Sequence, residues 1–215
     1  MKKNNLSKVL LVATLSIFLA TGTYQAIQHT SKGYEVLEVL DGDTFVIEKA
    51  QRVRLLGVDA PDLEYCGGEE AKEELEKMIG KNRVYLEEIV TDKLARIVAL
   101  VYVGNTPLNT EMAKKGWVEN NSTQNSEREN IKKAQEEARE NKLGIYSEEC
   151  SPMKNKEKPE CDIKGNNSVS GEKRYYPKGC SNYKQTIVQK FLGDEWFCTE
   201  KQAEKAGYVK AKSCY

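Results

Sequence analysis

The chain has 215 residues, of which 39% are hydrophobic and 31% are charged, with 33 basic and 33 acidic side chains. This length and composition allow one or two domains with a hydrophobic core, and they exclude collagen-like, low-complexity and polytopic membrane proteins. The sole histidine, His29, lies near the N-terminus. The body of the chain therefore cannot contain a Ser-His-Asp triad or an HExxH zinc site.

The zero net charge hides three segments of different charge. Residues 1–32 carry four Lys and no acidic residue. Residues 33–150 carry 16 basic and 25 acidic side chains, a net charge of −9, whereas residues 151–215 carry 13 basic and 8 acidic side chains, a net charge of +5. Overall neutrality is thus a cancellation, and it does not exclude a nucleic-acid substrate.

The N-terminus has the composition of an export signal. A basic start is followed by an apolar run of 12 residues from Val9 to Ala20, and small residues follow at Thr21 and Gly22. This run fits the hydrophobic region of a signal peptide and is short for a membrane span of about 20 residues. We therefore expect a signal peptide over residues 1–22, with an uncleaved membrane anchor as the alternative.

Residues 34–148 have the pattern of a small barrel with helices. Alternating apolar residues predict five strands, over residues 34–40, 44–48, 51–56, 83–88 and 97–103. Apolar residues at helical spacing predict three helices, over residues 69–79, 106–116 and 126–144. Five strands around one helix, followed by two more helices, predict an α+β fold of the five-stranded OB type.

The last two predicted helices carry start signals. Thr106-Pro107 is expected to open the second helix, and Ser126 with Glu129 forms the pattern of a capping box at the start of the third. The buried face of the third helix is expected to contain these four residues: Ile131, Ala134, Ala138 and Leu143.

The rest of the chain divides into a linker and a small module. Residues 149–160 contain two Pro and many charges and predict a linker, and residues 161–215 are rich in Cys and Tyr. Six cysteines in an exported chain predict disulfides, and Cys66–Cys150 is the economical pair outside the module. The four later cysteines could instead bind zinc, but they lack the close ligand pairs typical of such sites.

Three short stretches combine carboxylates and arginines at the ends of predicted strands. They are residues 39–44, 53–62 and 91–96. Taken alone, the first predicts only a tight turn, with Gly42 at positive φ and Asp41 capping its own backbone, and the second predicts only a polar loop. Arg54 is more informative, because it lies inside an apolar strand where a buried guanidinium needs anionic partners.

These stretches resemble the thermonuclease, or staphylococcal nuclease-like, domain. The shared pattern over residues 34–148 is V-x-DGDT, R-L-L-x-V-D-x-P, a Gly-Glu-x-Ala helix start, T-D-K-x-x-R, an L-N helix and a final L-G-I-Y. The resemblance implies an OB-fold that uses Ca²⁺ to hydrolyse phosphodiester bonds of DNA and RNA, by attack of water in line with the 5′-oxygen to leave 3′-phosphates.

By motif position, the resemblance also implies roles for individual residues. Asp43 and Asp59 would be the calcium carboxylates, and Ala60 would offer its backbone carbonyl. This oxygen set suits a hard cation. Arg54 and Arg96 would grip the scissile phosphate, for which a planar and permanently charged guanidinium is well suited. The position of the general base of the family is occupied by Asp62.

Three departures from the family pattern lower the expected turnover and nucleotide affinity. Asp62 stands where the family has Glu, one methylene longer, and Glu64 is a possible substitute without motif support. The stretch T-D-K-L-A-R lacks a Tyr near the nucleotide phosphate, and the polar stretch after Gly116 lacks the family's stacking tyrosines. A stacked base contributes roughly 1–3 kcal/mol.

The C-terminal module resembles a small domain appended to thermonuclease-like and other secreted bacterial proteins. The usual pattern of that domain is C-x-I-K-G-N, G-x-x-Y and W-F-C-x-E-x-E-A-x-x-A-G, and residues 161–166, 171–177 and 195–208 of this chain are similar to it. The resemblance implies a Cys161–Cys198 bridge, which leaves Cys180–Cys214 as an additional one. The module also carries a group of basic and tyrosine residues, for which we favour the interpretation of an ordinary solvated surface. Binding of nucleic acid and binding of the cell envelope are the alternatives. The residues are Lys173, Arg174, Lys178, Lys184, Lys190, Tyr175, Tyr176 and Tyr183.

The leading hypothesis is a secreted, monomeric, Ca²⁺-dependent nuclease that acts on DNA, with RNA as a second candidate substrate. The first alternative is a nucleic-acid-binding protein on the same barrel with weak or absent catalysis. The second is a cell-envelope-binding protein that acts through the C-terminal module.

Overall fold

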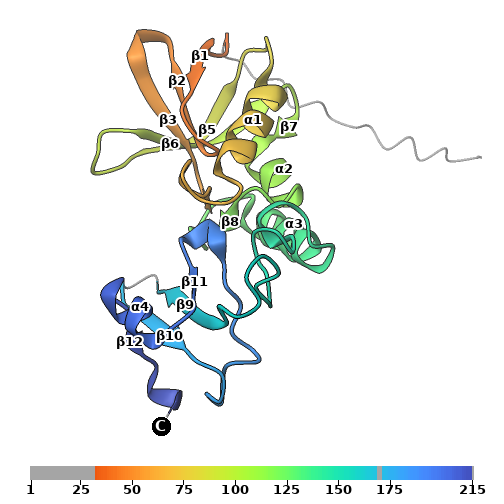
Figure 1. The fold of residues 1–215 in the computed structure, drawn as a ribbon. Helices are drawn as coiled ribbons and strands as arrows, with labels where there is room; N and C mark the ends of the chain where they lie inside the picture. The colour runs from red at the N-terminus through yellow and green to blue at the C-terminus, as the bar shows by residue number, and fades with distance from the viewer. Residues whose placement is uncertain (1–31, 169–170, 215) are drawn as a thin grey trace, which may run out of the picture.

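The computed structural model describes residues 32–168 and 171–214 (Figure 1). The predicted signal peptide or anchor lies outside the described residues. Within them, no helix combines the length and the apolar character needed to cross a bilayer. The curled sheet and three helices form one end of the described structure, and the Cys-rich module forms the other (Figure 1).

The sheet is curled as expected for an OB-like barrel. The strand order is β1-β2-β3-β6-β5. The short strand β7 pairs with the end of β6, at Tyr102 and Val103, beyond the residues that pair with β3. Neighbours are antiparallel except β3 and β6, which are parallel. The curl closes where Tyr34 and Val84 exchange two backbone hydrogen bonds of 2.8 and 2.9 Å. The strands are β1 (Val36–Val39), β2 (Thr44–Ile47), β3 (Gln51–Leu55), β5 (Tyr85–Thr91), β6 (Ile97–Val103) and β7 (Thr106–Pro107).

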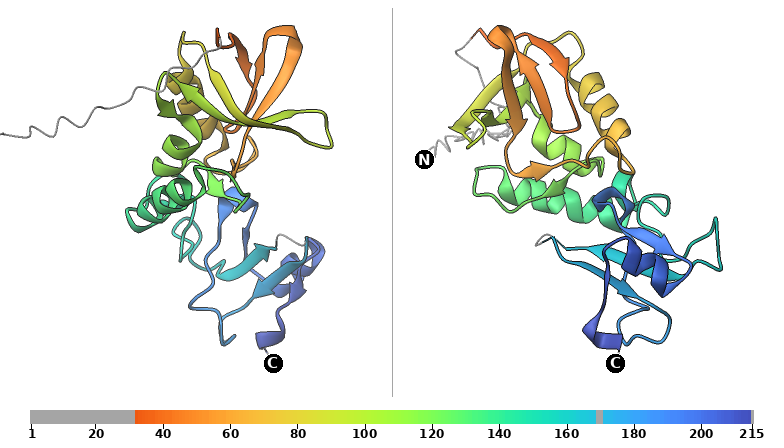
Figure 2. Two further views of the ribbon diagram at one scale, coloured as in Figure 1. Left: turned by 180° about the vertical axis from the view of Figure 1, so that it is seen from behind. Right: turned by 60° about the vertical axis from the view of Figure 1, so that its left-hand side comes forward.

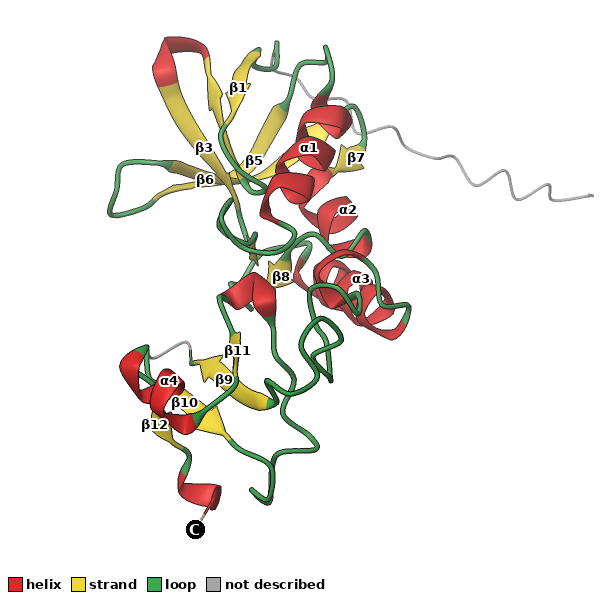
Figure 3. Cartoon of the chain, in the orientation of Figure 1, coloured by secondary structure: helices red, strands yellow, loops and turns green. Residues whose placement is uncertain are grey.

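Three helices complete the core, and Figure 3 shows the first two beside the sheet and the third beyond them. They are α1 (Gly68–Ile79), α2 (Leu108–Lys114) and α3 (Arg128–Glu140). The buried face of α1 consists of Ala71, Leu75 and Ile79, which pack in one cluster with strand residues such as Phe45 and Leu55. The three-to-four spacing of α1 thus buries a single apolar stripe against the barrel.

The starts of α2 and α3 differ from the sequence expectation. Thr106-Pro107 forms β7 instead of opening a helix, because both residues pair with β6. The predicted cap at Ser126 is also wrong. Its N–H donates to Glu88 Oε1 at 3.0 Å, and Asn125 Oδ1 accepts the N–H of Glu127, the residue that precedes the helix, at 2.9 Å.

Leu143 was expected on the buried face of α3 but is 43% exposed. The helix ends at Glu140, and the chain turns at Gly144 into the 3₁₀ segment η2 (Gly144–Tyr146). A Cβ at Gly144 would lie 2.2 Å from the Gly116 carbonyl oxygen, so this turn depends on glycine. Leu143 therefore lies beyond the helix, where the 3.6-residue periodicity no longer applies.

The C-terminal module is a small sheet with one short helix. Its strand order is β11-β9-β10-β12. Two disulfides lie within the module, Cys161–Cys198 and Cys180–Cys214, and Cys66–Cys150 joins the barrel to the following segment, so the pairs are those expected. The elements are β9 (Ile163–Asn167), β10 (Lys173–Tyr176), β11 (Glu195–Phe197), β12 (Val209–Lys210), α4 (Glu200–Lys205) and the 3₁₀ segments η3 (Lys190–Leu192) and η4 (Lys212–Cys214).

The module contacts the helical end of the barrel through η3 (Figure 2). Phe191 is buried in one cluster with Ala138, Ile145 and Tyr146. The N–H of Lys190 donates to the Cys150 carbonyl at 2.8 Å. This contact and the Cys66–Cys150 bridge fix the module close to the loop that follows the short strand β4 (Val58–Asp59).

Candidate active site

The first functional side chain lies in the turn between β1 and β2. Asp41 Oδ1 accepts the N–H of Asp43 at 3.0 Å, and this places the Asp43 side chain at the start of β2. Gly42 is required here for space, since a Cβ would lie 2.5 Å from Ala71 Cβ and 2.8 Å from Ala60 Cβ. Its φ is not among the positive values of the described glycines, which corrects the expectation for this residue.

Asp43 is almost completely buried and fully engaged. It is 1% exposed. Its Oδ1 accepts from Arg54 Nη1 at 2.5 Å and from Thr44 Oγ1 at 2.7 Å, and its Oδ2 accepts from the Ala60 N–H at 2.8 Å. Burial is the strongest influence on this carboxyl and raises its pKa to about 7, although Arg54 and the hydrogen bonds oppose that rise. Such a site favours a compensating cation.

Arg54 links the two candidate metal carboxylates. It lies on β3, where Thr44 of β2 is its partner on one side and Val98 of β6 on the other. Its Nη1 donates to Asp43, and its Nη2 donates to Asp59 Oδ1 at 2.6 Å. The structure thus supplies the anionic partners that a guanidinium in an apolar strand requires.

Asp59 lies in the short strand β4 (Val58–Asp59), which pairs with β8 (Glu119–Asn120). Its side chain is 52% exposed, so one of the two carboxylates opens to solvent. Asn121 Nδ2 also donates to Asp59 Oδ1, at 3.2 Å. The Asp59 carboxylate is therefore held in place by Arg54 and Asn121 while it remains accessible to solvent.

The loop after Asp59 contains the predicted general base. Asp62 is exposed, and its carboxylate makes no hydrogen bond or ion pair with another described residue. Its backbone is fixed, because its carbonyl accepts the Tyr65 N–H at 2.9 Å and leaves room only for glycine at position 68. Glu64 is likewise exposed. The loop is ordered by its backbone and by Cys66–Cys150, while both carboxylates point into solvent.

Arg96 lies just outside the strand next to β3 and has a different partner from Arg54. It precedes β6, two residues before Val98, which lies opposite Arg54. Arg96 Nε donates to Asp92 Oδ2 at 2.8 Å. Arg96 is thus paired with Asp92 and not with Asp43 or Asp59, the partners of Arg54.

Two residues near the site were missed by sequence reasoning. Asn121 holds Asp59, and buried Asn109 joins three backbone groups, since its side chain accepts the Val101 N–H and donates to the carbonyls of Leu56 and Ala99. The L-N pair that opens α2 was a signal for Asn109. No comparable signal existed for Asn121, which lies in a polar stretch.

The donor set fits a calcium ion in chemical type. Asp43, Asp59 and the Ala60 carbonyl are hard oxygen donors, as Ca²⁺ requires. No group of three or more His, Cys, Asp or Glu side chains suited to a metal occurs among the described residues. The pair of carboxylates would thus hold a metal only together with backbone, water or substrate oxygens.

Comparison with known proteins shows the family to which the chain is similar. Residues 52–148 match the family described as "Staphylococcal nuclease homologue". The chain is 32% identical over 128 residues to the thermonuclease of Staphylococcus intermedius, covering 54% of this chain and 76% of that protein. It is 29% identical over 143 residues to the thermonuclease of Staphylococcus hyicus, covering 60% of this chain and 83% of that protein.

A third relative is an "uncharacterized endonuclease" of Haemophilus influenzae. The identity is 30% over 113 residues, which cover 51% of this chain and 62% of that protein. The chain therefore spans less than two thirds of this relative. The matched region covers a larger share of the two thermonucleases, 76% and 83% of their lengths.

Proposed function

Because the chain belongs to the family of staphylococcal nuclease homologues, we propose that it is a Ca²⁺-dependent nuclease that hydrolyses phosphodiester bonds of DNA and also of RNA. The observation that carries this proposal is the contact of one guanidinium, on Arg54, with both Asp43 and Asp59. It brings together the cationic and anionic groups that such a reaction needs at one end of β3.

In this proposal, Asp43, Asp59 and the backbone carbonyl of Ala60 hold the ion. When bound, Ca²⁺ supplies positive charge beside a phosphate oxygen and favours attack on phosphorus. Asp43 suits this role because it is buried and its carboxylate is held by the Ala60 N–H and Thr44. Asp59 suits it because more than half of its side chain is exposed.

The two arginines act on the phosphate. Arg54 lies on β3 and Arg96 directly precedes the neighbouring β6. Both guanidinium groups would stabilise the charge that grows on the phosphoryl oxygens. Asp62 would accept the proton of the attacking water as the new P–O bond forms and the bond to the 5′-oxygen breaks. The leaving 5′-oxygen would take up a proton from solvent water, and the result would be a 3′-phosphate and a free 5′-hydroxyl.

We propose that the protein works outside the cytoplasm as a monomer. The three disulfides of the described residues favour an oxidising compartment, and the apolar run before residue 22 favours export. Extracellular calcium is abundant enough for sites with dissociation constants of about 10⁻⁴–10⁻³ M. A site with only two carboxylates would therefore be sufficient there.

Two observations favour a second candidate function, a nucleic-acid-binding protein with weak catalysis. The Asp62 carboxylate has no described partner to direct it, and Asn121 occupies a stretch where the family has stacking tyrosines. A misplacement of about 1 Å costs about 100-fold in rate. Binding of DNA in calcium without cleavage would favour this candidate.

The proposal is tested by cleavage of single-stranded DNA in millimolar Ca²⁺ by the wild type and by Asp43→Ala. We expect the variant to lose at least about 100-fold in kcat, as for the loss of a major charge-stabilising group. Glu38→Ala is the matched control, because Glu38 is an exposed acid on β1. Equal rates for wild type and Asp43→Ala would contradict the assignment.

Asp62 is tested by restoring the longer side chain. Asp62→Glu adds one methylene, and we expect kcat to rise because the carboxylate reaches further towards the phosphate site. Folding should be unaffected, since the Asp62 side chain is exposed. A fall in kcat would show that Asp62 already has its own workable geometry.

A further inference from the structure

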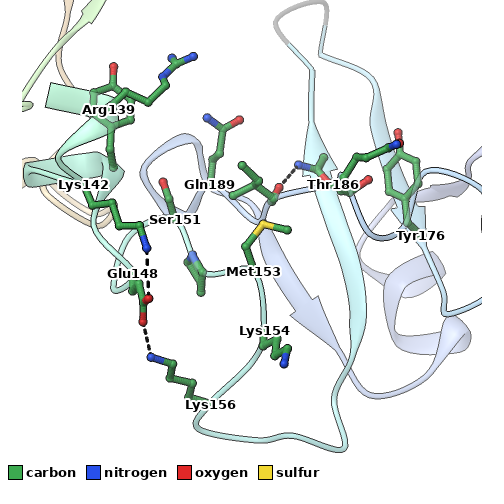
Figure 4. Close-up of a pocket in the computed structure, with 15 residues that line it drawn as sticks. Arg139, Lys142, Glu148, Ser151, Met153, Lys154, Lys156, Tyr176, Thr186 and Gln189 are labelled. Atoms are coloured by element: carbon green, nitrogen blue, oxygen red, sulfur yellow. Dashed lines mark hydrogen bonds and ion pairs between the residues drawn. The ribbon is translucent and has the colours of Figure 1, made fainter. Parts of the chain in front are cut away.

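A cleft lies between the end of α3 and the C-terminal module (Figure 4). Its volume is ≈ 840 Å³. Arg139 and Lys142 line one wall, Thr186 and Tyr176 line the other, and Met153 lies between them (Figure 4). The cleft is therefore formed jointly by the barrel, the connecting segment and the module.

The lining of this cleft is cationic. It contains four basic side chains and one carboxylate, Glu148, which pairs with Lys142 at 3.5 Å and with Lys156. The cations on the barrel side and on the connecting segment remain largely exposed, with exposed fractions of 57% for Arg139, 65% for Lys142 and 74% for Lys156. The four basic residues are Arg139, Lys142, Lys154 and Lys156. Such a surface attracts a phosphodiester chain.

The same cleft offers surfaces on which a base can lie. The ring of Tyr176 is half-buried, and the apolar side chains of Met153 and Ile187 are 46% and 40% exposed. Aromatic rings beside a positive groove are the usual elements of a site for single-stranded nucleic acid. A simple phosphate polymer has no bases and would gain nothing from Tyr176.

One end of the cleft lies next to the candidate active site. Arg139 Nη2 is 3.6 Å from Glu119 Oε1, and Glu119 is the residue opposite Asp59 in the β4–β8 pair. Residues opposite one another in antiparallel strands have Cα atoms about 4.5–5.5 Å apart. A single-stranded nucleic acid with one phosphate at Arg54 and Asp59 can thus continue past Arg139 into the cleft.

The outer face of the module is less suitable. Three of its cations each have a separate carboxylate partner, Arg174 with Glu172, Lys178 with Asp162 and Lys210 with Glu200. In the cleft, by contrast, Lys142 and Lys156 share the single carboxylate of Glu148. Its tyrosines are also engaged. Tyr175 is buried with its hydroxyl on Glu200, and the Tyr183 hydroxyl donates to the Asp162 carbonyl at 2.7 Å.

We propose that this cleft binds the single-stranded nucleic-acid segment adjacent to the scissile bond. The phosphates contact Arg139, Lys142, Lys154 and Lys156, and a base stacks on Tyr176. This inference rests on the proposed nuclease function, and it adds a substrate subsite made by the module. The module thereby favours long substrates over short ones.

The test measures the Kd of the full chain for a fluorescent single-stranded DNA, in the presence of a chelator so that no cleavage occurs. The DNA has about 20 nucleotides, more than most binding sites for single-stranded nucleic acid cover. Lys142→Gln/Lys154→Gln/Lys156→Gln should raise Kd at least about tenfold and reduce the magnitude of the salt slope by about 2, since each phosphate contact contributes about 0.7. The control is Lys77→Gln/Lys81→Gln/Lys201→Gln, which removes three exposed lysines elsewhere. Equal Kd values for the two triple variants would overturn the proposal.

The stacking contact is tested at Tyr176. Tyr176→Ala should raise Kd at least about fivefold, whereas Tyr176→Phe should bind like the wild type because it keeps the ring. A poly(glycerol phosphate) probe distinguishes a cell-envelope polymer from nucleic acid. Binding of that probe as tightly as DNA, with no effect of Tyr176→Ala, would contradict a nucleic-acid site.

Cleavage separates this inference from the proposed function. In calcium, the Lys142/Lys154/Lys156 variant should keep the wild-type kcat/KM on an oligonucleotide too short to reach the cleft, and should lose affinity only for long strands. Absence of all cleavage by the wild type would overturn the nuclease proposal, while the binding comparison in chelator would still decide on the cleft.

Discussion

The barrel and the C-terminal module are stabilised in different ways. The barrel has one cluster of 18 buried apolar residues, contributed by strands and all three helices. The core of the module contains five, Ile163, Tyr175, Phe197, Ala203 and Tyr208, and two disulfides cross it. A domain of this size rarely buries enough apolar surface to be stable without such bridges. The barrel is therefore held by its core and the module by its cross-links.

Buried charge is also used differently in the two regions. In the barrel, buried Asp43 meets Arg54 at an accessible site. In the module, the Lys164 ammonium donates to two backbone carbonyls, of Tyr183 and Thr186, and Asp194 accepts three hydrogen bonds from neutral amides. In the barrel, the charges pair with one another beside a carboxylate that is exposed to solvent. In the module, the charges are bonded to neutral groups of the backbone and of side-chain amides and fix the loop before η3.

The largest expected effect is the loss of core volume in the barrel. Phe45 is 0% exposed, and Phe45→Ala should lower the free energy of unfolding by about 3–5 kcal/mol. Leu37→Ala is the control on β1, with a side chain 59% exposed, and should change it by less than about 0.5 kcal/mol. Denaturant unfolding measures both, and similar values for the two variants would contradict a core-held barrel.

The next effect concerns the module alone. Replacing Cys161 and Cys198 by Ser should destabilise the module by about 2–5 kcal/mol, because the unfolded segment gains conformational freedom. Hydrogen exchange should accelerate over residues 161–214 and remain unchanged at the amides of β2 and β3. Equal acceleration in both regions would show that the two are one cooperative unit.

A smaller effect is expected at the contact between the regions. Phe191→Ala should weaken docking by about 1.5–3 kcal/mol, the value of burying one such side chain. The same hydrogen-exchange measurement should then show faster exchange around Ile145 and Lys190, with both cores protected. Leu192→Ala is the control, since Leu192 is 37% exposed. Unchanged exchange in Phe191→Ala would mean that other contacts hold the module.

The smallest effect is a pH dependence of the module. Burial raises the pKa of Asp194 to about 6, above an unfolded value of about 3.9. The folded module therefore binds more protons than the unfolded one between about pH 4 and pH 6, and its stability should fall as the pH rises through that window. Unfolding of wild type and Asp194→Asn across these pH values measures this difference, and the same slope in both would contradict it.

The sequence predicted the main elements of the barrel because their apolar spacing is regular. It also predicted that Arg54 needs anionic partners, and the structure shows Asp43 and Asp59 there. It did not predict β4 and β8, because a strand of two residues is too short to show alternation. Asn121 was missed for the same reason, since its importance comes from that pairing.

Other expectations failed because tertiary contacts decide them. Gly42 is required by the packing of α1 against the turn and not by a positive φ. At the start of α3, Glu88, 38 residues away in the chain, accepts the Ser126 N–H that Glu129 would accept in a capping box. Contacts of this kind depend on the closed barrel and leave no local pattern in the sequence.

The most direct test of a calcium-dependent barrel nuclease is the cleavage rate of a short oligonucleotide by the wild type as free Ca²⁺ is varied. The substrate is too short to reach the cleft, so the measurement reports on the barrel alone. We expect cleavage that rises with Ca²⁺, saturates in the millimolar range and disappears in chelator. Cleavage at an undiminished rate in chelator would contradict the central claim.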